Sequence, residues 1–204
     1  PRFYDATQGT VLVDGVDVRD YTFDALYDRL GYVTQKAVLF SGTVQDNIFF
    51  GQSEAVDTDE TLQQALQLSQ AAEFVDRYPE KAAHPIAQLG RNVSGGQKQR
   101  LSIARALARK PEILIFDDSF SALDYKTDAT LREGLAKQLP GTTKIIVAQR
   151  ISTIRHADQI LVLDRGEIAG LGTHDALMAS CPVYREIAMS QLSEEELKKG
   201  GASK

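Results

Sequence analysis

Apolar residues follow one another without interruption in two short stretches of the chain. EILIFDD at 112–118 and KIIVAQR at 144–150 each hold four consecutive apolar residues. Strands of this kind are typical of the middle of a parallel sheet, where both faces are buried. Between and around them, apolar residues recur at helical spacing, as Leu101, Ala104 and Leu107 do. The pattern predicts an α/β fold with a mostly parallel sheet that helices cover on both faces.

Helix boundaries can be predicted from capping residues and prolines. Thr22 can cap a short helix that runs through Leu30 and ends at Gly31. The segment 43–80 is mostly helical in pattern, and Leu62, Ala65, Leu66 and Ser69 give it one apolar or small face. A longer helix is expected to begin after Ser94 and to stop before Pro111.

Two hairpins and a charged tail complete the predicted elements. Asp14-Gly15 interrupts an alternating run, which is a strong two-residue hairpin signal, and Arg165-Gly166 is read in the same way. The residues from Ser193 to Lys204 are charged and are expected to fray.

Polar residues stand where the predicted parallel strands end. Gln35 ends the strand GYVTQ, Asp117 and Asp118 end the second strand, and Gln149 follows the third. Ligands of such sheets bind at the carboxyl ends of the strands. We therefore expect these residues to mark the functional site.

Composition narrows the class of protein. The chain has 204 residues and a net charge of −5, which argues against a nucleic-acid binder held mainly by phosphate contacts. Its one cysteine, Cys181, can form no internal disulfide and is read as a small buried hydrophobe. No apolar run reaches the roughly 20 residues that span a bilayer, so membrane association is expected to come through a partner or another segment.

Two local motifs suggest chemistry, each with a plain structural alternative. Ser94-Gly95-Gly96-Gln97 at a helix start would offer backbone N–H groups to phosphate, or it is only a helix start. Asp117 could hold Mg²⁺ while Asp118 orients or deprotonates a water, or both aspartates cap the turn that follows.

Taken in order, these motifs resemble the nucleotide-binding domain of ATP-binding cassette (ABC) transporters. SGGQ at 94–97 is similar to the family signature, ILIFDD to the Walker B strand, and SALD at 121–124 to the D-loop. Gln35 resembles the Q-loop glutamine, and Gln149 stands at the position of the switch histidine. LFSGTVQDNI at 39–48 is similar to the exporter type of the family.

The resemblance implies a fold and its division. The expected fold is a P-loop NTPase with a RecA-like core and a mostly parallel sheet, an inserted α-helical subdomain, and part of an antiparallel β-subdomain. The core would comprise 1–40 and 109–190, the helical subdomain with the signature 41–108, and the tail 191–204.

The resemblance also implies roles and partners. Asp117 and Gln35 would hold Mg²⁺, while Ser94, Gly95, Gly96 and Gln97 would contact ATP bound by the opposite subunit, and Asp124 would lie at that dimer contact. The partners would be a second nucleotide-binding domain and a transmembrane domain met by the helical subdomain, with no nucleic acid. The place of action would be the cytoplasmic face of the cell membrane.

Three departures from the family pattern change the expected activity. The Walker A loop has no match in the sequence, and the simplest account is truncation, so we expect little ATP affinity for this chain alone. Asp118 stands where the family usually has the catalytic Glu, and Gln149 where it has His. An Asp is one methylene short, and a Gln amide cannot carry a proton as His can. This pattern resembles the degenerate half of bacterial heterodimeric exporters of multidrug type.

Two other functions stay open at this point. A soluble ABC-type ATPase would be expected to show long coiled coils, a second cassette or a basic surface, and none of these occurs in the sequence. A nucleotide sensor without turnover fits Asp118 and Gln149 but leaves the intact SGGQ without a purpose.

Overall fold

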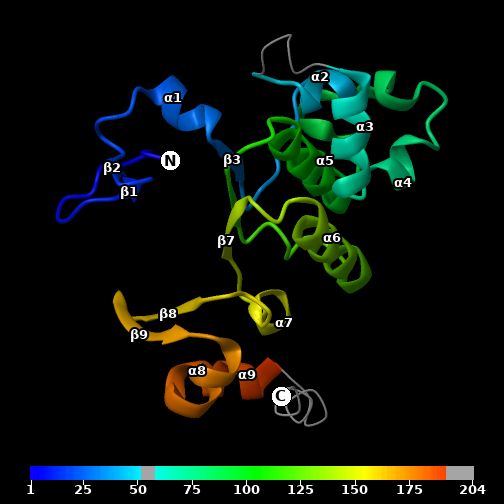
Figure 1. The fold of residues 1–204 in the computed structure, drawn as a ribbon. Helices are drawn as coiled ribbons and strands as arrows, with labels where there is room; N and C mark the ends of the chain where they lie inside the picture. Colours follow the sequence, from blue (N-terminus) through cyan, green and yellow to red (C-terminus); the bar gives the residue numbers. More distant parts are fainter. Residues whose placement is uncertain (52–57, 192–204) are drawn as a thin grey trace. The chain divides into compact units, whose positions relative to one another are not determined.

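The computed structural model describes residues 1–51 and 58–191 (Figure 1). The chain divides into two compact units, residues 1–147 and residues 148–204. The division into core and helical subdomain expected from the sequence is not tested by this and stays a prediction.

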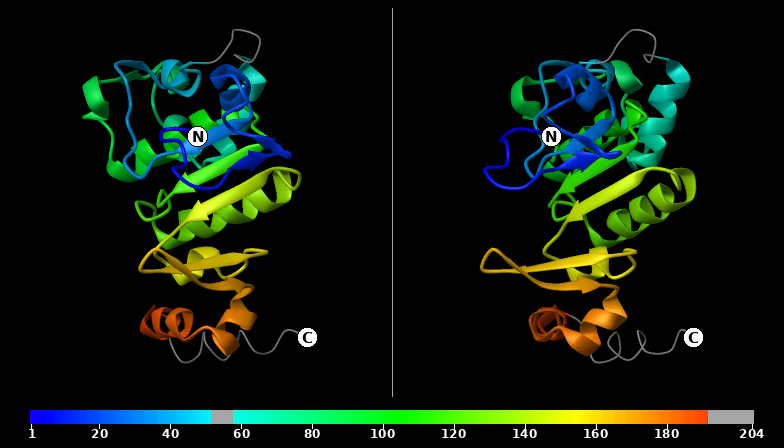
Figure 2. Two further views of the ribbon diagram at one scale, coloured as in Figure 1. Left: turned by 90° about the vertical axis from the view of Figure 1, so that its left-hand side faces the viewer. Right: turned by 60° about the vertical axis from the view of Figure 1, so that its left-hand side comes forward.

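A parallel sheet of three strands organises the first unit. Its strand order is β3 (Leu30–Val33), β6 (Ile113–Asp117) and β7 (Thr143–Val147), which lie side by side in Figure 2. The register pairs Tyr32 with Ile115 and Asp117 with Val147. The α/β class with a parallel sheet is therefore confirmed.

The prediction that these strands are buried on both faces was wrong. Leu114 and Phe116 of β6 are fully buried in one cluster with residues of the covering helices, but Ile113 and Ile115 on the opposite face are only half-buried. In β7, Ile145 keeps 49% of its surface exposed. Among the described residues, β7 is an edge strand and the helical core covers one face of the sheet. An apolar run fixes the strand but does not show what covers it.

Helices fill much of the segment between β3 and β6, and the buried stripe predicted there is present. The helices are α2 (Val44–Ile48), α3 (Asp59–Leu68), α4 (Ala72–Val75) and α5 (Gly95–Ala108). Shorter elements connect them: β4 (Gly42–Thr43), η1 (Lys81–Ala83), β5 (Pro85–Ile86) and η2 (Gln88–Gly90). Leu62, Ala65, Leu66 and Ser69 are all buried. After β6, α6 (Tyr125–Gln138) contributes Leu131 and Leu135 to the same core.

The N-terminal elements confirm one predicted turn and correct one predicted helix end. β1 (Leu12–Val13) and β2 (Val16–Asp17) pair across Asp14-Gly15, whose φ angles of 50° and 80° fit a type I′ turn. Thr22 caps α1 (Phe23–Asp28) as expected. The helix ends before Leu30, however, because Leu30 already belongs to β3. Gly31 lies within that strand, where an added Cβ would come within 2.8 Å of Leu114 and Pro111.

The second unit has its own small core. Its elements are α7 (Ile151–Ile154), β8 (Ile160–Asp164), β9 (Glu167–Gly172), α8 (His174–Ser180) and α9 (Pro182–Gln191). β8 and β9 form the predicted hairpin, with Arg165 at φ 49° and Gly166 at φ 83°. Cys181 is buried in this core, as expected. The charged tail predicted after Ser193 lies outside the described residues.

Candidate functional site at the ends of strands β3 and β6

The carboxyl ends of β3 and β6 bring three of the expected site residues together. Because the strands are parallel neighbours, the residues that follow them emerge at the same edge of the sheet. Gln35 donates from Nε2 to Oδ2 of Asp118 at 3.1 Å. Asp117 accepts at Oδ2 a hydrogen bond of 2.9 Å from the hydroxyl of Tyr32. Each of the two adjacent carboxylates thus has a neutral donor of its own.

Asp118 is held in an unusual backbone conformation. Its φ is 45°, in the left-handed region, which costs a residue other than glycine about 1–2 kcal/mol. Its N–H donates to the carbonyl of Val147 at 2.9 Å, and its carbonyl accepts from Oγ of Ser121 at 2.7 Å. Its surface is only 9% exposed. Strain of this kind persists where the surroundings fix it, and it is commonest at functional sites.

The turn after Asp118 ends at the capping residue of the next helix. Asp124 caps α6, accepting from the N–H of Thr127 at 2.9 Å and from its hydroxyl at 2.7 Å. These two hydrogen bonds hold the pKa of the Asp124 carboxyl below its ordinary value. In the same turn, Oγ of Ser119 is fully buried and has no hydrogen-bond partner among the described residues.

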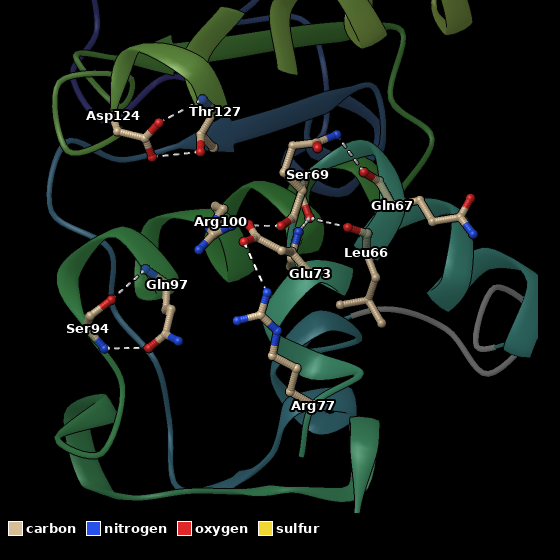
Figure 3. Close-up of polar contacts among 12 residues, drawn as sticks. Leu66, Gln67, Ser69, Glu73, Arg77, Ser94, Gln97, Arg100, Asp124 and Thr127 are labelled. Carbon is tan, nitrogen blue, oxygen red and sulfur yellow. Dashed lines mark hydrogen bonds and ion pairs between the residues drawn. The ribbon is translucent and has the colours of Figure 1, made fainter. Parts of the chain in front are cut away.

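The signature sequence opens helix α5 with a complete capping box. The N–H of Gln97 donates to Oγ of Ser94 at 3.3 Å, and the side chain of Gln97 accepts from the N–H of Ser94 at 2.8 Å (Figure 3). A Cβ added to Gly95 would meet no atom within 4 Å, so this turn is open to an approaching group. A Cβ on Gly96 would lie 3.5 Å from the carbonyl oxygen of Ala122, which places the signature beside the turn that contains Asp124.

Three side chains fasten α5 to its surroundings. Gln99 donates to the carbonyl of Thr34 at 3.1 Å, directly before Gln35. Arg100 bonds Glu73 of α4 at 2.9 Å (Figure 3). Arg105 donates to the backbone carbonyl of Asn47 at 2.6 Å and to its side-chain oxygen at 3.1 Å. The helix that carries the signature is therefore tied both to the strand end and to α2.

An exposed aromatic pair lies beside the last of these contacts. The rings of Phe40 and Phe50 stack with centroids 4.2 Å apart, and the guanidinium of Arg105 lies 5.4 Å from the Phe40 centroid. Both rings remain substantially exposed, at 42% and 53%. The two rings therefore form a small exposed apolar surface next to α5.

Gln149 belongs to the second unit, whereas the residues described so far belong to the first. Its backbone carbonyl accepts from Nε2 of Gln191 at 2.8 Å, while Oε1 of Gln191 accepts from the N–H of Ile151 at 2.9 Å. The structure thus brings Gln35 and Asp118 together and shows how the backbone at Gln149 is fixed.

The oxygen ligands at the strand ends fit a hard divalent cation. Mg²⁺ prefers a few oxygen donors from the protein and keeps several waters, and Gln35, Asp117 and Asp118 supply an amide and two carboxylates. The two carboxylates are not part of a larger cluster: within the residues that the structure describes, no group of three or more His, Cys, Asp or Glu side chains could hold a metal ion. Water molecules and phosphate oxygens would complete the coordination of a Mg²⁺ ion held by these side chains. None of the helices in residues 1–51 and 58–191 is long and apolar enough to cross a membrane.

Sequence reasoning missed Tyr32, Gln99 and Arg105. Tyr32 could have been found from register, because a residue on β3 paired with Ile115 shares a sheet face with Asp117. Gln99 and Arg105 act through contacts with residues distant in sequence, which no local sequence pattern predicts.

Comparisons with known proteins agree on one family. The sequence model described as ABC transporter matches residues 2–121. An uncharacterized ABC transporter ATP-binding protein of Mycobacterium tuberculosis is 48% identical over 93% of this chain and 32% of the relative. An ATP-dependent lipid A-core flippase of Syntrophus aciditrophicus is 40% identical over 97% of this chain and 32% of its own length.

A solved structure supports the same assignment. The structure of a bacterial Atm1-family ABC exporter with ATP bound matches with a TM-score of 0.89 and 37% identity, over 95% of this chain and 34% of that one. The chain spans about a third of the length of the relatives that it matches.

Proposed function

Because the chain belongs to the ABC transporter family, we propose that it is the ATP-binding motor domain of an ABC exporter, in which ATP binding and hydrolysis drive export. The observation that carries the proposal is the meeting of Gln35 and Asp118 at the ends of adjacent strands, in the chain that also presents an open SGGQ turn. Since the chain spans about a third of its relatives, the activity is proposed for the whole exporter.

In this proposal the strand ends handle the metal and the water. Asp117 and Gln35 would hold Mg²⁺, which when bound would neutralise charge on the phosphates of ATP. Asp118 would accept the proton of the attacking water, the part that a Glu usually has in the family. Its side chain is shorter by one C–C bond, about 1.5 Å, and its carboxylate is already bonded to Gln35. This site would therefore bind ATP and hydrolyse it slowly.

The signature turn would serve a second nucleotide-binding domain. Ser94, Gly95, Gly96 and Gln97 would face the γ-phosphate of ATP held by that domain, in a head-to-tail pair with Asp124 at the contact. The open side of Gly95 and the helix N-terminus suit an anion. With Asp118 where the family usually has Glu and Gln149 where it usually has His, the chain would be the degenerate half of a heterodimer, like that of multidrug exporters.

The membrane domain would dock on the helical segment. The stacked pair Phe40 and Phe50 offers an apolar contact, and Arg105 behind it connects that contact to the signature helix. A loop of the membrane domain seated there would lie at the cytoplasmic face of the cell membrane.

A pair of substitutions in the complete exporter with its partner tests the proposal. We expect Asp118→Ala to keep most of the steady-state ATPase activity, and Gly95→Asp to reduce it by more than about 100-fold, because a carboxylate would then face phosphate. Gly95 has room for a side chain, so the change should not disturb the fold. Gly95→Asn matches its size without its charge, and it should lose less activity.

Other outcomes identify the alternatives. Loss of turnover in Asp118→Ala would make Asp118 a working base and would remove the asymmetric reading. Full ATPase activity in Gly95→Asp would show that the signature faces no phosphate. ATP binding without turnover in the wild-type exporter would favour the nucleotide sensor.

A further inference from the structure

Tyr32 meets Asp117 across two neighbouring parallel strands. Tyr32 pairs with Ile115, and Asp117 lies two residues farther along β6, so both side chains stand on the same face of the sheet. The tyrosine hydroxyl donates to Oδ2 of Asp117 at 2.9 Å. This diagonal reach is within the span of an aromatic side chain.

The tyrosine ring is held in place by a third residue. The ring of Phe3 packs edge-to-face against it, with centroids 5.3 Å apart. With the ring held in this way, the hydroxyl is placed to donate to Oδ2 of Asp117. An ordered ring with a protonated hydroxyl can fix the direction of a carboxylate.

Asp117 and Asp118 are adjacent acids, but each accepts a hydrogen bond from a different residue. Gln35 bonds Asp118 at 3.1 Å, whereas Tyr32 bonds Asp117 at 2.9 Å. Both donors are neutral, so neither cancels the charge that a metal needs. The hydroxyl holds Oδ2 of Asp117, and a carboxylate held in this way could still coordinate a cation.

We infer that Tyr32 is a positioning residue that orients the Asp117 carboxylate toward the Mg²⁺ of the nucleotide site. The inference rests on the proposed function, since it assigns a second layer to that same site. Hydrogen-bond partners of metal-holding carboxylates contribute to metal affinity even though they do not touch the metal. Tyr32 would thus act on metal-dependent nucleotide binding and leave metal-independent binding unchanged.

The test measures how much the metal adds to nucleotide affinity in the complete exporter. The fluorescent, non-hydrolysable nucleotide mant-AMP-PNP is titrated with saturating Mg²⁺ and again with excess EDTA. We expect Tyr32→Phe to reduce the ratio of the two affinities by about tenfold in the site built on this chain. If a different partner chain supplies the second site, only one binding phase should shift. Affinity in EDTA and the melting temperature should stay within error of the wild type.

Two further variants make the result specific. Tyr21→Phe removes another tyrosine hydroxyl bond, to the carbonyl of Val13 at 3.1 Å, and should leave the affinity ratio unchanged. In an Asp117→Asn background, Tyr32→Phe should change the ratio no further, because the two residues act as one unit.

Several results would overturn the inference. An unchanged ratio in Tyr32→Phe, or an equal reduction in the Asp117→Asn background, would show that the hydroxyl does not act through Asp117. A parallel loss of affinity in EDTA and of melting temperature would assign Tyr32 a purely structural role. If the wild-type exporter bound the nucleotide equally well with and without Mg²⁺, the proposed function would fail at this site, whatever Tyr32 does.

Discussion

The N-terminus of α5 and the end of β6 differ in how their backbones are held. At the start of α5, Ser94 and Gln97 cap each other reciprocally, and Gln99 bonds the chain next to Gln35. At the end of β6, Asp118 has a positive φ and its carboxylate accepts from a neighbouring amide. The first region is a helix start with an ordinary capping box, whereas the second holds backbone strain.

The first kind of region suits anion binding, whereas the second is where a catalytic base would stand. A helix N-terminus attracts an anion through backbone groups, so it tolerates small changes in side-chain position. A general base must reach one proton, and a displacement of about 1 Å can cost roughly 100-fold in rate. In the proposed exporter, the chain keeps the element that depends on its backbone and departs from the family where reach matters.

Lengthening the base at the end of β6 should give a large gain of activity. Asp118→Glu together with Gln149→His should raise the ATPase rate of this chain's own site by about 10- to 100-fold, because the first lengthens the base and the second supplies a titratable ring. The rate is measured in the complete exporter with the partner's site inactivated. Asp20→Glu adds a methylene to an exposed acid of the same unit and serves as the control.

The double variant can also contradict the comparison. An unchanged rate would mean that Asp118 already reaches its water or that another feature limits turnover. The difference between the two regions would then be one of backbone conformation alone.

Local chemistry explains what the sequence could predict. The turn at Asp14-Gly15 and the caps Thr22 and Ser94 depend on contacts within a few residues, and each is present. The meeting of Gln35 with Asp118 followed from parallel strands, whose carboxyl ends share one edge of the sheet.

Contacts between distant segments explain what the sequence did not predict. Apolar runs at 113–116 and 145–148 predicted two fully buried strands, but the cover over each face comes from other segments. Gly31 looked like a helix end and is instead a place where β3 passes close to Leu114 and Pro111. The partner of Arg105 lies 58 residues away, at Asn47, and nothing local indicates it.

A smaller effect concerns the helix caps Ser94 and Asp124, whose contributions to stability should depend differently on pH. Ser94→Ala should destabilise the first turn of α5 by about 1 kcal/mol, equally from pH 3 to pH 7, because a hydroxyl does not titrate there. Asp124 has a depressed pKa, so its capping contribution is complete above its ordinary value of 3.8 and is lost as the pH falls through the lower folded value. Asp124→Asn should therefore remove an acid-sensitive component from α6 and leave α5 unchanged.

Amide hydrogen exchange in the first turns of α5 and α6, compared between variant and wild type at each pH, measures both effects. A Ser94→Ala effect that grew toward low pH would contradict this assignment. The assignment would also be contradicted if the protection of α6 amides in the wild type did not change with pH.

The smallest expected effect concerns two serines in the turn after Asp118. Oγ of Ser121 donates to the carbonyl of Asp118 at 2.7 Å, whereas Oγ of Ser119 is buried without a partner among the described residues. A buried hydroxyl without a partner costs stability, and a satisfied one contributes about 1 kcal/mol. Ser119→Ala should therefore raise the free energy of unfolding by up to about 1 kcal/mol, and Ser121→Ala should lower it by a similar amount. Urea denaturation of the exporter's nucleotide-binding unit measures both. If Ser119→Ala is destabilising, the Ser119 hydroxyl has a hydrogen-bond partner in the complete protein, as the Ser94 hydroxyl has at the start of α5.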